Sequence, residues 1–220
     1  MKKIGVFMAD GCEEIEALTV VDICRRAGIE VAMISITGEK IVKGAHEINF
    51  ETDIPAEFMD FEMLDGIVLP GGMPGTLNLG ANKYVLQTII DFNCKGKLVS
   101  AICAAPSVLG EAGLLKGKKA TSYPGFEDKL IGAEVMLMAK NGVDGVYSSD
   151  PKVNSNSIRY NKLTYLDIIN KSLEVMDHSA LTLCKENNID ILVFDINLPN
   201  SIIDALNKKI NTTLISNEGK

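Results

Sequence analysis

The sequence predicts an α/β protein whose parallel sheet is covered by helices on both faces. Two observations support this class. Short, continuously apolar segments alternate with helical patterns, as strands of a parallel sheet buried on both faces do. Turn-forming residues, among them Asp10-Gly11 and Pro70-Gly71-Gly72, follow the apolar segments directly. The four expected strands of this sheet cover residues 3–9, 30–36, 66–70 and 98–102.

The first helix is expected over residues 13–27. Its first turn is rich in glutamate and its last turn carries two arginines, an order that complements the helix dipole. Gly28 provides the stop. The apolar positions of this helix are Ile15, Leu18, Val21 and Ile23.

The remaining elements follow from similar patterns. Residues 40–54 are mixed and polar, which indicates a hairpin or an extended excursion. Helical patterns follow the third and fourth strands, and a short strand precedes the turn at Tyr123. The later helices are expected over residues 83–92, 106–115, 165–173, 179–186 and 201–208, and the later strands over residues 120–122 and 189–196.

Composition limits the possible functions. The chain has 220 residues and a formal net charge of −7, which argues against binding to a nucleic-acid backbone. Its five cysteines include no CxxC motif, so we expect free thiols in a reducing cytoplasm rather than a disulfide framework or a zinc site. No apolar run reaches the ~18 residues that a membrane span needs, and the apolar start is too short for a signal peptide.

Cys103 is the first candidate for chemistry. It lies at the joint between an expected buried strand and a helix that begins near Pro106. Unpaired N–H groups at a helix N-terminus favour an anion, so a thiol in this place is expected to be acidified to a pKa of about 3.5–7.5. Asp10-Gly11 and Pro70-Gly71-Gly72 also follow strands, at the sheet edge where ligands bind in open α/β folds. The alternative is a buried structural cysteine.

Four motifs carry a resemblance. DGCEEIEA, VLPGGMPG, SAICAAPSVL and TSYPGFEDKL occur in this order and resemble the ThiJ/PfpI superfamily, DJ-one branch. The resemblance implies a flavodoxin-like sheet, a homodimer, and a nucleophilic cysteine at a sharp turn. It implies that Cys103 is this cysteine, that the Glu16 carboxyl bonds to its sulfur, and that the amides of Gly72 and Ala104 form an oxyanion pocket.

These roles are chemically coherent. A carboxyl beside a thiolate is expected to stay protonated, because two anions share a dry site at high cost. It can then donate to the thiolate and move a proton. The alternative role for Glu16 is a favourable interaction with the helix dipole. Protease-like members of the superfamily place histidine after the cysteine, whereas this chain has Ala104, which disfavours a Cys-His hydrolase.

Two further residues are candidates for the pocket. His46 lies in VKGAHEI, which the resemblance places near the dimer interface and the mouth of the active site. Its alternative is a solvated loop histidine. Cys12 lies one helical turn before Glu16 and is either a second thiol beside the pocket or a small packing residue.

The sequence changes character after about residue 132. The SRGPG-type loop of the superfamily does not occur in the chain. VDGVYSSDP, YNKLTY, VMDHSA and ILVFDI resemble instead the C-terminal part of bacterial uridylate kinases, of the amino-acid-kinase fold. That resemblance implies that Asn141, Tyr147 and Asp150 contact the nucleoside of ATP, although the same residues also suit a simple turn region.

The chain is therefore interpreted as a fusion of two partial proteins. Residues 1–132 are expected to form an incomplete ThiJ/PfpI-like domain and residues 133–220 a partial kinase-like segment, joined in the string Ile131-Gly132-Ala133-Glu134-Val135. The phosphate loop and nucleoside-monophosphate pocket of the kinase are missing, so little phosphoryl transfer is expected. The C-terminal elements normally pack on a sheet of the kinase that is absent from this chain, so we expect them either to borrow the exposed face of the truncated first sheet or to pack loosely.

The leading functional hypothesis is a cytoplasmic enzyme that acts on small reactive aldehydes, of the glyoxalase or deglycase type. No metal or organic cofactor is implied, and ATP is relevant only if the kinase-like segment still binds it. The alternatives are a redox sensor or chaperone in which Cys103 is oxidised, a nucleotide-binding remnant, and an inactive fusion product.

Overall fold

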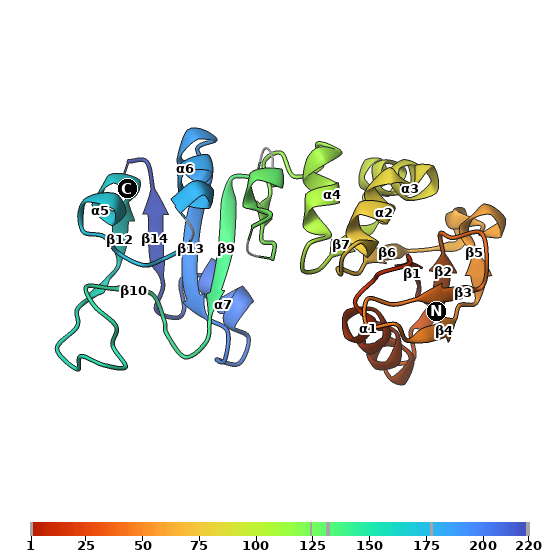
Figure 1. Cartoon of the computed structure of the whole chain (residues 1–220), viewed down its shortest axis with the longest axis horizontal. Helices are drawn as coiled ribbons and strands as arrows, with labels where there is room; N and C mark the ends of the chain where they lie inside the picture. The colour runs from red at the N-terminus through yellow and green to blue at the C-terminus, as the bar shows by residue number, and fades with distance from the viewer. Residues whose placement is uncertain (1, 124, 131–132, 177, 219–220) are drawn as a thin grey trace. The chain divides into compact units, whose positions relative to one another are not determined.

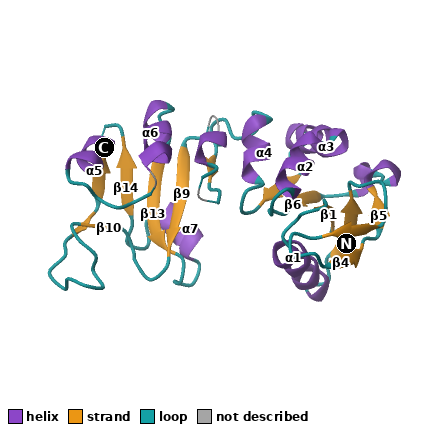
Figure 2. Cartoon of the chain, in the orientation of Figure 1, coloured by secondary structure: helices purple, strands orange, loops and turns teal. Residues whose placement is uncertain are grey.

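The structure is a computed structural model that describes residues 2–123, 125–130, 133–176 and 178–218. It divides into two compact units, Met1–Leu114 and Leu115–Lys220, and each is described by itself (Figures 1 and 2). Two residues of the expected junction, Ile131 and Gly132, lie outside the described residues. Within the described part of the chain, no helix is long and apolar enough to cross a membrane.

The first unit is built on a five-stranded sheet in the order β5-β2-β1-β6-β7. All four strand pairings are parallel, which confirms the predicted class. The strands of the unit are β1 Lys3–Met8, β2 Glu30–Ser35, β3 Ile41–Lys43, β4 Asn49–Glu51, β5 Ile54–Pro55, β6 Gly66–Leu69 and β7 Leu98–Ala101. The helices are α1 Glu14–Arg26, η1 Ala56–Phe58, η2 Phe61–Met63, α2 Gly75–Ala81, α3 Lys83–Cys94 and α4 Pro106–Glu111.

Helices cover the two faces of this sheet. α1 packs against β1 and β2, whereas α3 and α4 pack against β7; Figure 1 shows α1 on one side of the sheet and α2, α3 and α4 on the other. The core side of α1 carries Glu14, Ala17 and Val21. Of the expected apolar positions, Val21 is buried and Leu18 packs against the core, whereas Ile15 and Ile23 are 73% and 58% exposed. Only part of the predicted apolar face therefore meets the core.

The order of the strands indicates where in the first unit a ligand site is expected. β1 is flanked by β2 on one side and β6 on the other, so the chain reverses its direction of winding between β1 and β6. Ligands bind at such a switch point, beyond the carboxyl ends of the strands. The loops after β1, β6 and β7 all lie at this edge, because the three strands are parallel.

β7 differs from its prediction. It forms the edge of the sheet and its residues are half-buried, with Leu98 58% exposed. The expectation of a buried strand before Cys103 is therefore wrong: apolar composition alone does not distinguish an edge strand from a central one. The segment 40–54 forms the antiparallel hairpin β3–β4, one of the two predicted forms.

The second unit has a five-stranded sheet of its own, in the order β12-β14-β13-β9-β8. β13 and β14 are antiparallel and the other pairs are parallel. Its strands are β8 Lys119–Ala120, β9 Val135–Lys140, β10 Val146–Tyr147, β11 Arg159–Tyr160, β12 Lys162–Thr164, β13 Asp190–Asp195 and β14 Thr213–Ser216. Its helices are η3 Glu127–Lys129, α5 Tyr165–Asn170, α6 His178–Glu186 and α7 Ser201–Leu206.

This sheet corrects the expected packing of the C-terminal elements. They form a sheet of their own, in which β13 matches the expected strand over residues 189–196, whereas β9, β12 and β14 were not predicted. α7 packs on β13, and Ala205 joins Leu137 and Phe194 in a small buried cluster. β8 lies in the part of the chain that resembles ThiJ/PfpI proteins, yet it pairs with β9 in the second unit.

Candidate functional site

Cys103 lies two residues after β7 and before the first turn of α4. Its φ is +61°, a left-handed conformation that is uncommon for a residue with a side chain. Strain of this kind is typical of a nucleophile at a sharp strand-to-helix turn. Pro106 begins α4 without needing a hydrogen-bonded N–H, and Ala104 and Ala105 are small and buried. The turn therefore presents the half-buried thiol at the sheet edge.

Three predicted site residues meet at this thiol. The Glu16 side chain and the backbone amides of Gly72 and Ala104 are all within hydrogen-bonding reach of the Cys103 sulfur. One carboxylate oxygen of Glu16 also accepts the Gly71 N–H at 2.9 Å. This bond fixes Glu16 on the loop after β6, so that carboxyl, thiol and two amides belong to one arrangement.

Gly71 is a site residue that the sequence analysis did not single out. A Cβ at this position would lie 2.6 Å from both the Cys103 Cβ and the Glu16 Oε2. Contacts that short require something to move. Glycine therefore lets the loop backbone approach the thiol and the carboxyl together. The signal was present in the Pro-Gly-Gly sequence, but a glycine in a turn usually serves the turn alone.

Gly72 has a second structural role. Its φ is +91°, and a Cβ would lie 2.2 Å from the Glu13 nitrogen. The Glu13 N–H donates to the Gly71 carbonyl at 3.0 Å, and the Gly75 N–H donates to the Gly11 carbonyl at 3.0 Å. The loop after β6 thus lies directly against the loop after β1, which brings the N-terminus of α1 to the thiol.

The electrostatics of Cys103 correct one prediction. Burial and then the adjacent Glu16 carboxylate raise the pKa of the Cys103 thiol, and the amides of Ala104 and Gly72 lower it by less. The expected acidification at the helix N-terminus is therefore wrong. α4 has only six residues, and desolvation beside a carboxylate outweighs the dipole of so short a helix.

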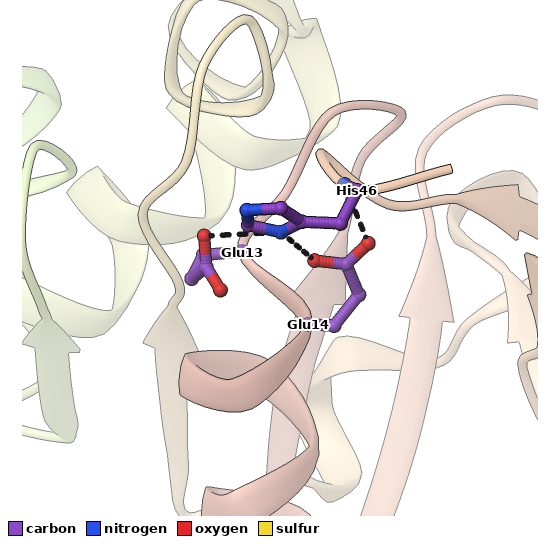
Figure 3. Close-up of side chains that lie close together, drawn as sticks. All are labelled: Glu13, Glu14 and His46. Carbon is purple, nitrogen blue, oxygen red and sulfur yellow. Dashed lines mark hydrogen bonds and ion pairs between the residues drawn. The ribbon is translucent and has the colours of Figure 1, made fainter. Parts of the chain in front are cut away.

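His46 lies at the N-terminus of α1, where its partner is Glu14. The His46 backbone N–H donates to Glu14 Oε1 at 2.8 Å, and its Nδ1 lies 2.9 Å from Glu14 Oε2 (Figure 3). These contacts lower the pKa of Glu14 to about 2 and raise the pKa of His46. Among the described residues, the charged partners of His46 are therefore Glu14 and Glu13 at the start of α1, and the hydrogen-bonding groups around the Cys103 sulfur come from Glu16, Gly72 and Ala104.

Cys12 is fully buried in the core of the first unit. Burial is the largest cause that raises its pKa to about 11. A neutral, enclosed thiol is a packing residue, which was one of the two expected roles.

Only two of the three residues expected to contact ATP line the same cavity of the second unit. Tyr147 and Asp150 line one cavity of about 410 Å³, together with Lys140 and Lys171. Asn141 does not line this cavity and accepts a hydrogen bond from the Asn197 side chain at 2.8 Å. Lys140 was not predicted: burial lowers its pKa, and its Nζ donates to the Val175 carbonyl at 2.7 Å.

The first unit thus defines a class: an α/β protein with a flavodoxin-like sheet, whose thiol sits in a left-handed turn beside a carboxyl and two amides. The model of the DJ-1/PfpI family matches residues 2–158, and the chain belongs to this family. The chain is similar to protein dj-1beta of Drosophila melanogaster, at 35% identity over 59% of this chain and 70% of that protein. The structure of oxidized Toxoplasma gondii DJ-1 has 37% identity and a TM-score of 0.57, covering 59% of this chain and 71% of that one.

The C-terminal part is similar to a different group. The model of the amino acid kinase family matches residues 129–195. The uridylate kinase of Ureaplasma parvum is 51% identical over 38% of this chain, and the match spans only 36% of that enzyme. The chain therefore has two parts, a DJ-1/PfpI domain followed by a segment that corresponds to about a third of a uridylate kinase.

Proposed function

We propose that the first unit is a thiol-dependent enzyme that acts on small reactive aldehydes, of the glyoxalase or deglycase type. The observation that carries this proposal is the left-handed Cys103 with Glu16 and the amides of Gly72 and Ala104 around its sulfur. A thiol, a proton acceptor and two fixed N–H donors are the groups that addition to a carbonyl requires.

The reaction is balanced without an added oxidant or reductant. The Cys103 sulfur bonds to the aldehyde carbon, the carbonyl π electrons move to oxygen, and Glu16 takes the thiol proton and returns it to that oxygen. In an α-oxoaldehyde, the hydrogen on the first carbon then moves as a proton to the second carbon, and the hydroxyl proton on the first oxygen moves to the second oxygen. The product is a thioester beside a carbon that carries a hydroxyl group. Water cleaves the thioester to a 2-hydroxy acid and restores the thiol.

The raised pKa of Cys103 fits this role for Glu16. A thiol that stays protonated near neutral pH needs a base at the moment of attack, and the Glu16 carboxylate is already hydrogen-bonded to it. The two amides stabilise negative charge as it develops on the reacting atoms. Glu16 thereby acts as a proton carrier rather than only as a partner of the helix dipole.

Turnover of methylglyoxal by the full chain is the decisive measurement. We expect Cys103→Ser to reduce turnover to background and Glu16→Gln to reduce it by about 10²-fold or more. Cys94→Ser is the matched control, because Cys94 is exposed at the end of α3. Equal turnover in the wild-type chain and Cys103→Ser would refute the proposal.

A second candidate function is oxidation sensing at Cys103, in which the thiol is oxidised to a sulfinic acid. It is favoured by the half-buried thiol and by the similarity to a T. gondii DJ-1 whose structure is described as oxidized. Two equivalents of peroxide convert a thiol to a sulfinic acid and release two waters. Stoichiometric oxidation of Cys103 in a chain that shows no methylglyoxal turnover would support this alternative.

We also propose that the first unit forms a homodimer. α1 and the loop of the β3–β4 hairpin expose apolar side chains at Ile15 and Ile48, which are 73% and 55% exposed. Pairing of two copies would cover them. Light scattering of the full chain should give twice the chain mass, and Ile15→Glu should return it to the mass of one chain. A monomeric wild-type chain would contradict the proposal.

ATP binding in the second unit remains a further candidate. Tyr147 and Asp150 line a cavity large enough for part of a nucleotide. Equilibrium dialysis of the full chain with ATP tests it, with Asp150→Ala as the variant expected to weaken binding. Identical retention of ATP by both proteins would exclude this cavity as the site.

A further inference from the structure

Three side chains that the proposed thiol chemistry does not use converge at the start of α1. Glu13 is the N-cap residue of α1, Glu14 lies in its first turn, and His46 comes from the loop between β3 and β4. His46 Nδ1 lies 2.9 Å from Glu14 Oε2 and 3.7 Å from Glu13 Oε2, and one donor atom from each residue lies within 4.8 Å of the others. Figure 3 shows both carboxylates directed at the imidazole.

We propose that Glu13, Glu14 and His46 form a binding site for a divalent metal ion of the zinc class. Zinc binds nitrogen and oxygen ligands at about 2.0–2.2 Å, so two ligands in a tetrahedral site stand about 3.4 Å apart. The separations of 2.9 and 3.7 Å in the cluster lie on either side of this value. Small side-chain rotations would therefore bring the three donor atoms around one ion.

Burial fixes the central ligand. The Glu14 side chain is 6% exposed, and the His46 backbone amide holds its Oε1 at 2.8 Å. Oε2 is consequently directed at the Nδ1 of His46. An outer hydrogen bond that orients a ligand is what metal sites usually require. Gly44 makes room for this carboxylate, since a Cβ there would lie 2.2 Å from Glu14 Oε1.

Charge favours a cation at the same place. Two carboxylates and a neutral imidazole carry two negative charges, which a divalent ion balances fully and a proton on His46 balances only in part. Lys43 of the same hairpin is paired with Glu47 at 2.9 Å. The metal would replace the proton of the His46–Glu14 ion pair rather than add to it.

The ligand set and its exposure indicate the kind of site. One imidazole with two carboxylates suits Zn²⁺ or Co²⁺ better than Mg²⁺ or Ca²⁺, which prefer oxygen ligands alone. His46 is 67% exposed at its side chain in the single chain, so the three protein ligands leave one side of the site open. With three protein ligands and an open side, the site resembles an exchangeable metal site rather than a closed structural one.

The experiment measures Zn²⁺ affinity by competition with a chromophoric chelator, using the full chain in a Cys24→Ser, Cys94→Ser, Cys103→Ser background to remove the thiols that are not buried. Glu13→Gln and His46→Gln are compared in this background with two matched controls. His178→Gln removes the other histidine of the chain, and Glu57→Gln removes an exposed carboxylate of the first unit. Glu14 is left unchanged because its burial makes loss of folding the expected result of its substitution.

We expect one equivalent of Zn²⁺ per chain, at least a tenfold weaker affinity in Glu13→Gln and His46→Gln, and changes of less than twofold in the controls. Co²⁺ bound to the chain in this background should show no sulfur-to-metal charge-transfer band. Absence of stoichiometric binding would mean that the cluster is an ion pair only. Equal affinity in His46→Gln and His178→Gln, in variants that melt like their parent, would also overturn the proposal.

Discussion

Neighbouring groups act in opposite directions on the pKa of the Cys103 thiol, and a labelling experiment can measure the net result. Desolvation and the Glu16 carboxylate raise the pKa of the thiol, whereas the amides of Ala104 and Gly72 lower it. We expect iodoacetamide labelling of Cys103, followed by mass spectrometry across pH, to show a midpoint above that of an ordinary cysteine. A midpoint at mildly acidic pH would contradict this expectation.

Glu16→Gln should lower the pKa of Cys103, because the hydrogen bond and the charge of Glu16 both raise it. The direction of this change in the Cys103 pKa distinguishes a charged Glu16 from a protonated one. A protonated Glu16, as expected from the sequence, would stabilise the thiolate, so its removal would raise the pKa instead. The labelling midpoint of Glu16→Gln relative to the wild-type chain therefore reports the charge of Glu16, with Cys94→Ser as the control that should leave it unchanged.

Cys12 gives a stability prediction at alkaline pH. Its folded-state pKa is raised from 9.0 to about 11, so the folded protein holds this proton more tightly than the unfolded chain. The resulting stabilisation is complete below pH 9 and is lost as pH rises toward 11. At about 1.4 kcal/mol per pKa unit, the free energy of unfolding should fall by about 2–3 kcal/mol more in the wild-type chain than in Cys12→Ala. Parallel pH profiles in urea melts of the two proteins would be the contrary result.

Among elements, the loop after β6 determines whether the site forms. Gly72→Ala adds a Cβ against the Glu13 nitrogen at a φ of +91°, and we expect it to destabilise the first unit by about 2–4 kcal/mol and to shift the labelling midpoint of Cys103 toward that of an ordinary cysteine. Gly80→Ala is the matched control. Gly80 lies within α2, and a Cβ there meets only Val108 at 3.5 Å, so this variant should be neutral or up to about 1 kcal/mol more stable. Equal melting temperatures for Gly72→Ala and the wild-type chain would refute the role of this glycine.

Local sequence patterns predicted the limits of helices and strands in the first unit better than they predicted the contacts that these elements make. α1 begins and ends within one residue of the expected limits because its glutamates, arginines and Gly28 act locally. α2 was missed, since Gly75 and Gly80 mask its pattern. The site follows the same rule: Cys103, Glu16 and Gly72 come from recognisable motifs, whereas the His46–Glu14 contact depends on where the hairpin of β3 and β4 folds back, which no local pattern encodes.

On the scale of the whole molecule, each part of the chain lacks elements of its relatives, yet each forms a sheet. In the second sheet, β8 forms one edge. Motif content placed this segment in the first domain, with a boundary at residue 132, whereas the compact units divide after Leu114. The motifs of residues 115–130 indicate the family from which this segment derives. The strand with which β8 pairs depends instead on which sheet edge is free to accept it, and the sequence of the segment itself does not contain that information.

Uridylate kinase activity should be absent from the chain. Phosphoryl transfer needs both nucleotides and the phosphate-stabilising groups positioned together, and the kinase-like segment spans only 36% of the U. parvum enzyme. We expect no production of UDP from UMP and ATP above the buffer rate, even if ATP binds the cavity beside Tyr147. Measurable turnover that disappears in Asp150→Ala would show that the segment retains more of a site than its length indicates.

The pairing of β8 with β9 provides a test of whether residues 115–130 belong to the first or to the second unit. Ala120 pairs with Met136, and the Glu134 N–H donates to the Lys118 carbonyl at 2.8 Å. Proline at position 120 removes a backbone donor and restricts the strand, so Ala120→Pro should destabilise the sheet to which β8 belongs. Hydrogen exchange read by mass spectrometry should show faster exchange in β9 and β13, with no change in β1 and β6. Leu98→Pro in β7 is the reciprocal control, since β7 pairs with β6 and should affect the first sheet alone. Faster exchange in β1 and β6 on Ala120→Pro would mean that residues 115–130 belong to the first unit, as the motif boundary predicts.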